Sequence, residues 1–256
     1  MQISQLAAQL YTLRDFLKTP DEIHATLKKV RAIGYQAVQV SGMAPIDELE
    51  LKAMLDGEGL VCCATHEGTK TILEEPEIVV ARLQKLDCLF TAVPSPGGYD
   101  LSTPFAVKEF AAKMNAAGKV LADNGQTLCY HNHHFEFVRV GGKTLLEWFY
   151  DETEPRNLQG EIDTYWVQYG GGSTLDWCQR LHHRLPLIHL KDYGIGTENN
   201  PVFREIGSGN MNWQKIIPEA QNAGCQWFIV EQDTCDGDPF DALQTSFEYV
   251  KTHFCD

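Results

Sequence analysis

Three residues that could bind a metal ion each follow a short apolar segment in the second half of the chain. They are Asp163, His189 and Glu231. If those segments are successive strands of one parallel barrel, the three side chains meet around its axis. Two carboxylates and an imidazole suit a divalent ion such as Mn, Mg, Co or Zn and leave positions open for substrate oxygens. We therefore predict one divalent metal ion here, although each residue alone could be an ordinary polar group at a strand end.

Two more charged residues share a strand face with these candidates. The two-residue period of a strand places Glu161 with Asp163, and Lys191 with His189. Glu161 is predicted either to orient a metal ligand or to belong to a buried ion pair. Lys191 is a candidate substrate-binding residue, because an ammonium group beside a metal can polarise a carbonyl or stabilise an enolate. Ion pairing alone would also explain it.

The densest polar run of the chain is YHNHHFE at 130–136, directly after an apolar segment. His131 and His133 share one strand face, whereas Glu136 has the opposite parity and reaches the centre only if the chain turns after the strand. These three residues and Glu231 are the predicted acid/base groups.

Short segments rich in apolar and β-branched residues alternate eight times with longer amphipathic stretches, which is typical of parallel strands joined by helices. Pro and acidic residues mark helix starts, as in TPDE at 19–22, and glycines such as Gly34 mark helix ends. The fold class is therefore α/β. The predicted strands are Ile3–Leu13, Tyr35–Val40, Leu60–His66, Cys88–Val93, Gln126–His133, Leu158–Tyr165, Pro186–Lys191 and Trp227–Glu231.

Polar residues gather at the carboxyl ends of these strands, where barrel enzymes carry their chemistry. His66 at the end of the third strand and Asn132 near the end of the fifth are predicted to contact substrate. No G-x-G-x-x-G motif follows the first strand, which removes the main support for an open dinucleotide-binding sheet. The chain has 256 residues, close to the roughly 250 of an eight-fold β/α barrel. We predict a single (β/α)8 TIM-barrel domain over residues 1–256.

Composition narrows the choice of partners. The formal net charge of -14 disfavours a nucleic-acid partner. No apolar run of about 18 residues could span a bilayer, and the N-terminus lacks the features of a signal peptide, so we expect a soluble cytoplasmic protein. The eight cysteines are scattered without a C-x-x-C pair. Those in or beside apolar strands are interpreted as small buried hydrophobes, namely Cys62, Cys63, Cys88, Cys129 and Cys225.

Taken together, these motifs resemble the sugar phosphate isomerase/epimerase superfamily of xylose-isomerase-like barrels along nearly the whole chain. The resemblance rests on YHNH and FEF at 130–137, EIDTYW at 161–166, HLKD at 189–192, GSG at 207–209 and Glu231. It implies one divalent ion, bound by Glu136, Asp163, His189 and Glu231.

The first of these ligands has a competitor. In the epimerases the strand-five glutamate lies within the strand, at the place where this chain has His131, so either His131 or Glu136 could be the ligand. The resemblance also implies a substrate contact by Arg204 and assembly into homo-oligomers.

The leading hypothesis is an isomerase or epimerase that moves a proton through an enediolate, with two acid/base groups on opposite faces of a small ketose-like sugar. The alternative is a metal-dependent lyase or hydrolase acting on a keto-sugar, keto-inositol or 3-keto-glycoside. The histidines of strand five support this alternative, because a leaving oxygen needs a proton donor. A non-catalytic sugar-binding barrel fits so many titratable residues less well. The GSG segment could offer amides to a phosphate or be a plain turn, so phosphorylation of the substrate stays open.

Overall fold

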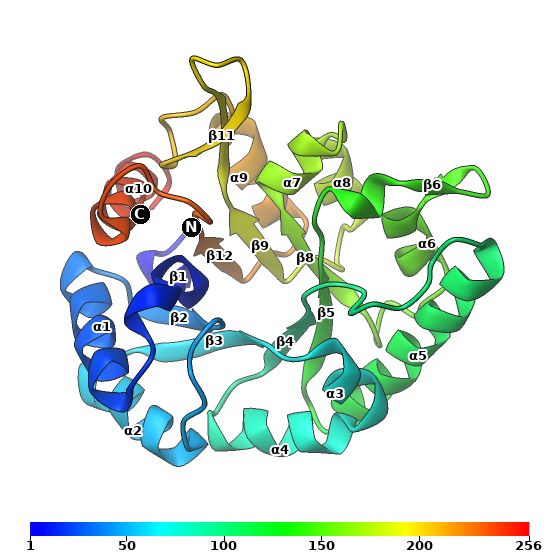
Figure 1. Ribbon diagram of the computed structural model, residues 1–256, viewed down its shortest axis with the longest axis horizontal. Helices are drawn as coiled ribbons and strands as arrows, with labels where there is room; N and C mark the ends of the chain where they lie inside the picture. Colours follow the sequence, from blue (N-terminus) through cyan, green and yellow to red (C-terminus); the bar gives the residue numbers. More distant parts are fainter. Residues whose placement is uncertain (256) are drawn as a thin grey trace.

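The computed structural model describes residues 1–255, and its centre is a closed barrel of parallel strands (Figure 1). Strands adjacent along the chain are neighbours in the barrel, and the first pairs with the last through the register Leu6 with Phe228. The predicted (β/α)8 fold is thereby confirmed. The barrel strands are β1 (Leu6–Gln9), β2 (Ala37–Val40), β3 (Val61–His66), β4 (Phe90–Val93), β5 (Thr127–His131), β8 (Gln159–Asp163), β9 (Leu187–Leu190) and β12 (Trp227–Val230).

Helices surround the barrel on its outside (Figure 1). None of the helices within residues 1–255 is long and apolar enough to cross a membrane. The helices are α1 (Pro20–Ile33), α2 (Glu48–Glu58), α3 (Thr69–Glu74), α4 (Pro76–Lys85), α5 (Pro104–Asp123), α6 (Leu145–Asp151), α7 (Thr164–Tyr169), α8 (Thr174–Arg180), α9 (Trp213–Asn222) and α10 (Pro239–Phe254), with 3-10 turns η1 (Ile3–Gln5), η2 (Leu10–Phe16) and η3 (Phe135–Phe137).

Two hairpins were not predicted from the sequence. One pairs β6 (Arg139–Val140) with β7 (Lys143–Thr144), and the other pairs β10 (Asp192–Ile195) with β11 (Pro201–Arg204). Each is inserted after a barrel strand, and β10 and β11 rise beside α7 in Figure 1.

The first strand is shorter than predicted. The sequence pattern gave Ile3–Leu13, but only Leu6–Gln9 is strand, and η2 begins directly after it. The Gln9 side chain accepts a hydrogen bond from the backbone N–H of Tyr11 and so caps this turn. The polar residue that ends the strand therefore also starts the 3-10 helix.

The helix signals at 19–34 are confirmed in α1. Thr19 caps the helix by accepting from the backbone N–H of Glu22, and Pro20 occupies the first turn. Gly34 ends the helix with a φ of 127°, and a Cβ there would lie 2.5 Å from the ring of Phe247. Glycine is therefore required at this position both by the backbone angle and by the packing of α10.

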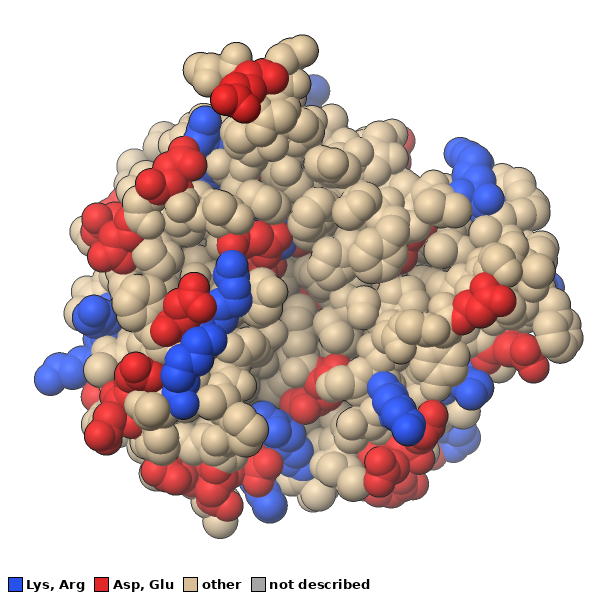
Figure 2. Space-filling model, viewed as in Figure 1, with Lys and Arg blue, Asp and Glu red and all other residues tan. Residues whose placement is uncertain are grey.

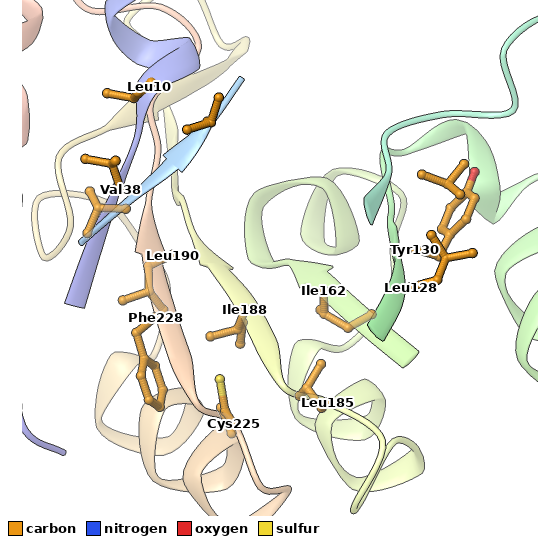
Figure 3. Close-up of a cluster of buried hydrophobic side chains, with 14 of the residues drawn as sticks. Leu10, Val38, Leu128, Tyr130, Ile162, Leu185, Ile188, Leu190, Cys225 and Phe228 are labelled. Atoms are coloured by element: carbon orange, nitrogen blue, oxygen red, sulfur yellow. The ribbon is translucent and has the colours of Figure 1, made fainter. Parts of the chain in front are cut away.

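Alternation along the strands separates two apolar layers. Small or aliphatic side chains such as Ala7, Cys63, Ala92 and Leu187 form a cluster that fills the barrel interior. The opposite faces pack against the helices, and Figure 3 shows part of this outer layer. Its labelled residues include Leu128, Tyr130, Ile162, Ile188 and Leu190. Since successive strand residues face opposite sides, the residues between them point inward.

Helix α5 approaches the barrel wall closely at Gly118. A Cβ at this position would lie 1.7 Å from the carbonyl oxygen of Asn157. The absence of a side chain therefore permits the contact between α5 and the segment that leads into β8.

Candidate metal and substrate site

Four buried side chains converge at the carboxyl end of the barrel. Each of His131, Asp163, His189 and Glu231 offers one ligand atom, and these atoms all lie within 4.8 Å of one another. Asp163 is directly opposite His189 in the register of β8 and β9. Three of the predicted ligands are thus brought together with His131 from β5.

The donor set fits a divalent cation. The Oδ2 atom of Asp163 is buried and lies 3.0 Å from the Lys191 ammonium. Burial raises the pKa of Asp163 above its usual range, because the charged form is poorly solvated there. Two imidazoles and two carboxylates are ligands that Mn, Co or Zn accept.

Lys191 lies among three carboxylates beside this cluster. Its Nζ atom is 2.8 Å from Glu231 Oε2, 3.0 Å from Asp233 Oδ2 and 3.0 Å from Asp163 Oδ2. Burial disfavours the ammonium form, but Asp163, Glu231 and Asp233 outweigh burial and raise the pKa of Lys191. The side chain is therefore a fixed positive charge on one side of the site.

A hydrogen-bonded layer supports the cluster from inside the barrel. His189 contacts Glu231 Oε2 through Nδ1 at 2.9 Å and Gln39 Oε1 through Nε2 at 2.6 Å. Gln39 also donates to Glu161 Oε1 at 2.6 Å, and His66 Nε2 lies 2.6 Å from Glu161 Oε2. Glu161, left open between two roles by the sequence, both pairs with histidines and orients them.

This layer also sets the charge of the histidines. Burial disfavours the imidazolium form of His189, but Glu161 and Glu231 outweigh burial and raise its pKa to about 10. His189 would therefore give up a proton when it binds a metal ion. Burial and the neighbouring His189 lower the pKa of His131 well below its usual value. His131 is therefore a neutral imidazole, the form in which histidine binds metals.

A cavity of about 510 Å³ opens above the cluster. In Figure 2 the same face is hollowed near its centre. Burial, with Lys191 next, lowers the pKa of His133 on the cavity wall to about 3. Within residues 1–255, the buried indole Nε1 of Trp166 has no hydrogen-bond partner. The lining residues are Tyr11, Arg14, Ser41, His66, Pro94, Ser95, His131, His133, Phe135, Trp166, Lys191, Glu231, Asp233 and Thr234.

Glu136 is not brought to the cluster. Its Oε1 accepts from the Tyr130 hydroxyl at 2.6 Å, and its Oε2 accepts from the backbone N–H of His133 at 2.8 Å. Tyr130 belongs to the outer layer of the barrel wall, so the Glu136 carboxylate lies behind the strand. Burial raises the pKa of Glu136 to about 7. The chain does turn after β5, as the sequence analysis required, but this turn, η3, directs Glu136 outward and not toward the barrel axis.

Two predicted substrate contacts also lie elsewhere. Arg204 ends β11 and pairs with Asp236 Oδ2 at 2.7 Å, outside the cavity lining. Asn132 is buried and its Oδ1 accepts from the backbone N–H of Asp163 at 3.0 Å. Asn132 therefore fixes the end of β8 and does not line the cavity.

The GSG segment is organised by Asp192. Its Oδ2 accepts from the backbone N–H groups of Gly207 and Gly209 at 2.8 and 3.2 Å, and from the indole of Trp213 at 2.7 Å. The amides that could have held a phosphate are thus already bonded. The aspartate of the HLKD motif is the anion that this loop binds.

Asp233 was missed by the sequence analysis. It lines the cavity, contacts Lys191, and has its pKa raised to about 6, first by burial and then by Glu231. The signal was its position two residues after Glu231, which repeats the parity argument used for Lys191. Its place beyond the end of β12 concealed it.

The closed parallel barrel, with polar side chains converging at the carboxyl ends of its strands, defines a TIM barrel with a candidate metal site. Residues 27–253 match the sequence model of one family. The chain belongs to the xylose isomerase-like TIM barrel family.

Individual relatives are distant. The inosose dehydratase of Geobacillus thermodenitrificans (strain NG80-2) is 23% identical over 155 residues, which are 54% of this chain, and the chain spans about half (51%) of that relative's length. A sugar phosphate isomerase/epimerase from Parabacteroides distasonis ATCC 8503 superimposes with a TM-score of 0.84 at 21% identity, covering 98% of this chain and 95% of the other. An L-ribulose 3-epimerase gives a TM-score of 0.73 at 13% identity, covering 97% and 94%. The two structures show a shared fold.

Proposed function

We propose that this chain is a metal-dependent enzyme that removes the proton beside the carbonyl of a neutral keto-sugar. The observation that carries the proposal is the buried cluster of His131, Asp163, His189 and Glu231, with the Lys191 ammonium 3.0 Å from Asp163 Oδ2. These four residues would hold the ion. A divalent ion bound there would supply Lewis acidity toward a carbonyl oxygen.

The residues around the cluster divide the remaining work. Asp233 is the carboxylate placed to accept the proton, because it lines the cavity and is not one of the four ligands. Lys191 stabilises the negative charge that develops on the carbonyl oxygen. His66 lines the cavity while its Nε2 is held by Glu161, so its ring is fixed for substrate contact.

The lining favours a neutral substrate. Among the described residues, the cationic side chains of this cavity are Lys191 and Arg14. Lys191 is surrounded by carboxylates, and Arg14 donates to the backbone carbonyls of Tyr11 and Asp233 at 3.0 and 2.9 Å. A phosphate needs donors that are free to point at it. The loop amides at 207 and 209 are bonded to Asp192.

Elimination is the outcome that the arrangement of charges supports best. Asp163, Glu231 and Asp233 all lie on the Lys191 side of the site. In a 3-keto-glycoside, Asp233 takes the proton from C2, and the C2–H electron pair forms the C2=C3 bond of an enolate whose charge lies on the C3 oxygen. The C3 carbonyl then re-forms, the C2=C3 pair moves to a C1=C2 bond, and the C1–O bond breaks. The departing oxygen keeps the electron pair of that bond and takes up the proton from Asp233. One carboxylate serves both transfers, so no group on the opposite face is required.

Epimerisation, which the sequence placed first, is the second candidate. It needs proton delivery from the opposite face, and His133 lines the cavity with its Nδ1 unbonded within residues 1–255. The names of the relatives include both a dehydratase and an epimerase, which is consistent with a shared first step. Within residues 1–255, the carboxylates that line the cavity are Glu231 and Asp233, both on the Lys191 side. We therefore rank this outcome below elimination.

The test is an NMR assay in D2O with Mn²⁺-loaded protein and methyl 3-keto-β-glucoside. Release of methanol with formation of an unsaturated keto-sugar supports the lyase. Deuterium at C2 with an inverted configuration and no methanol supports the epimerase. If neither deuterium exchange nor product appears with this compound, with ketohexoses or with keto-inositols, the proposal is wrong.

A further inference from the structure

A continuous strip of aromatic side chains leaves the cavity across the barrel mouth. We call Phe135, Trp166, Tyr169 and Phe203 the aromatic strip. Phe135 and Trp166 line the cavity, and they are linked by the His133 ring, whose centroid is 5.2 Å from that of Phe135 and 5.5 Å from that of Trp166. The Trp166 ring centroid is 5.6 Å from that of Tyr169 and 5.7 Å from that of Phe203. The strip therefore begins inside the cavity and ends outside it.

Three separate elements build the strip. Trp166 and Tyr169 are three positions apart on α7, so their side chains lie on the same face of that helix. Phe203 comes from β11, and its ring stacks on Tyr165 at 4.0 Å. Phe135 belongs to η3, where the His133 ring stacks on it at 5.2 Å and 8°. These ring contacts hold the strip in place without a ligand.

Part of the aromatic strip is exposed to solvent, unlike the aromatic side chains of the core. Tyr169 and Phe135 retain 46% and 36% of their accessible surface. Contiguous apolar surface of this kind commonly marks a binding site. Because the strip is continuous with the cavity, its occupant is best explained as a part of the same ligand.

We propose that the aromatic strip binds a second ring, joined through a glycosidic oxygen to the keto-sugar that reacts. The inference rests on the proposed function, in which the group attached at C1 leaves. The cavity of about 510 Å³ lies within the range of about 300–1,000 Å³ that drug-sized ligands fill, and such ligands exceed a single hexose. An aromatic face packs against the C–H face of a sugar ring or against an aryl group, and both share this chemistry.

The strip also accounts for a neutral partner. Its four members carry no formal charge, and Arg204 at the end of β11 is paired with Asp236. A second ring bearing a phosphate would find no free cation among these residues. The ligand class is thus a neutral disaccharide or aryl glycoside in its 3-keto form.

The experiment compares three ligands that share the reacting ring, namely the 3-keto forms of methyl β-glucoside, phenyl β-glucoside and cellobiose. Turnover by the Mn²⁺-loaded wild type is measured as kcat/KM for each. We expect the better two-ring compound to exceed the methyl glycoside by about tenfold, since each aromatic contact contributes about three- to tenfold in affinity. Preference for cellobiose identifies a sugar ring, and preference for the phenyl compound an aryl ring.

Two variants test whether the strip causes the preference. In Tyr169→Ala and Phe203→Ala, the ratio of two-ring to one-ring kcat/KM should fall by about three- to tenfold. Ile78→Ala on α4, which removes an exposed apolar side chain elsewhere, should keep the wild-type ratio. A lowered ratio must appear in KM, with an unchanged elution volume on gel filtration.

Three results would overturn the inference. The first is equal turnover of one-ring and two-ring compounds by the wild type, which would leave the proposed function intact. The second is an unchanged ratio in both strip variants. The third is a change of oligomeric state in those variants, which would assign the strip to a contact between subunits. Loss of all turnover in the wild type, by contrast, contradicts the proposed function itself and with it this inference.

Discussion

Tyr130 holds the carboxylate of Glu136 on the outer side of the barrel wall, with 2.6 Å between its hydroxyl oxygen and Oε1. His131, the next residue along β5, points to the opposite side and joins the candidate metal cluster. Adjacent strand residues always diverge in this way. Tyr130 and His131 are adjacent and therefore face opposite sides of the strand. As a result His131 reaches the barrel axis, whereas Glu136, which is bound to Tyr130, does not.

Metal content should follow the cluster. His131→Ala and Asp163→Ala should each reduce bound divalent metal, measured by elemental analysis after dialysis against Mn²⁺, to well below the wild-type ratio. Glu136→Gln is the matched control and should keep the wild-type content, because its carboxylate bonds Tyr130 and the backbone of His133. Metal lost from Glu136→Gln but retained in His131→Ala would reverse our assignment.

The pH dependence of stability should carry the signature of Glu136. Burial raises its pKa from 4.5 to about 7 in the folded protein, so the native state holds this proton more tightly than the unfolded state. Its stabilising contribution is fully present below pH 4.5 and is lost as the pH rises through 7. At 1.36 kcal/mol per pH unit, the loss is about 3 kcal/mol. Asp233, whose pKa is raised to about 6, titrates over the same range in both proteins. Urea unfolding at pH 5 and pH 8 should therefore show a larger loss in wild type than in Glu136→Gln. Parallel changes in both proteins would refute it.

Replacing Lys191 should make folding depend on divalent metal. Lys191→Met leaves Asp163, Glu231 and Asp233 without their shared cation. Removing one partner from a buried ion pair costs about 3–5 kcal/mol, so the Tm in EDTA should fall. Added Mn²⁺ should then raise the Tm of the variant more than that of wild type. Equal Tm shifts in the two proteins would show that the ammonium does not neutralise the site.

Asp233→Asn should separate proton transfer from metal binding. Loss of a positioned acid/base group lowers rates by about 10²–10⁴-fold, and we expect kcat to fall in that range with metal content unchanged. Asp236→Asn provides the comparison, because that carboxylate is 86% exposed and contacts Arg204. A decrease of less than tenfold in Asp233→Asn would remove this residue from the proposed mechanism.

The contact at Gly118 should be sensitive to a single methyl group. A Cβ there would lie 1.7 Å from Asn157 O, and overpacking of this kind costs about 1–3 kcal/mol or more. Gly57→Ala, in helix α2 with open space around it, should instead gain up to about 1 kcal/mol. Chemical denaturation of both variants checks the pair. Equal stabilities would mean that α5 can shift without loss.

The eight strands and their polar carboxyl ends could be predicted because both signals are local. Short apolar segments marked each strand, and the two-residue repeat within a strand placed Asp163 and His189 on the inner face. The orientation of Glu136 could not be predicted, since it depends on a hydroxyl that emerges on the far side of β5. The bonds from Gln39 to His189 and Glu161 were equally inaccessible, because they join side chains from three different strands.

The sequence predicted only part of the charge arrangement around Lys191. An ion pair was one of two interpretations of this residue, and the structure gives it three carboxylate neighbours from β8 and the end of β12. Predicting that number requires the barrel to be closed first. A residue on the loop after β12, such as Asp233, has no periodic signal until the strand end is known.

The fluorescence of Trp166 should report ligand binding in the cavity. Of the five tryptophans, it is the one on the wall of this cavity, and its indole N–H has no partner within residues 1–255. Trp148, Trp177 and Trp213 are buried in the apolar layer behind the strands. Indole emission shifts with the polarity around the ring, so a ligand that covers Trp166 changes the fluorescence over a nearly constant background. The protein therefore carries an unlabelled reporter of its own occupancy.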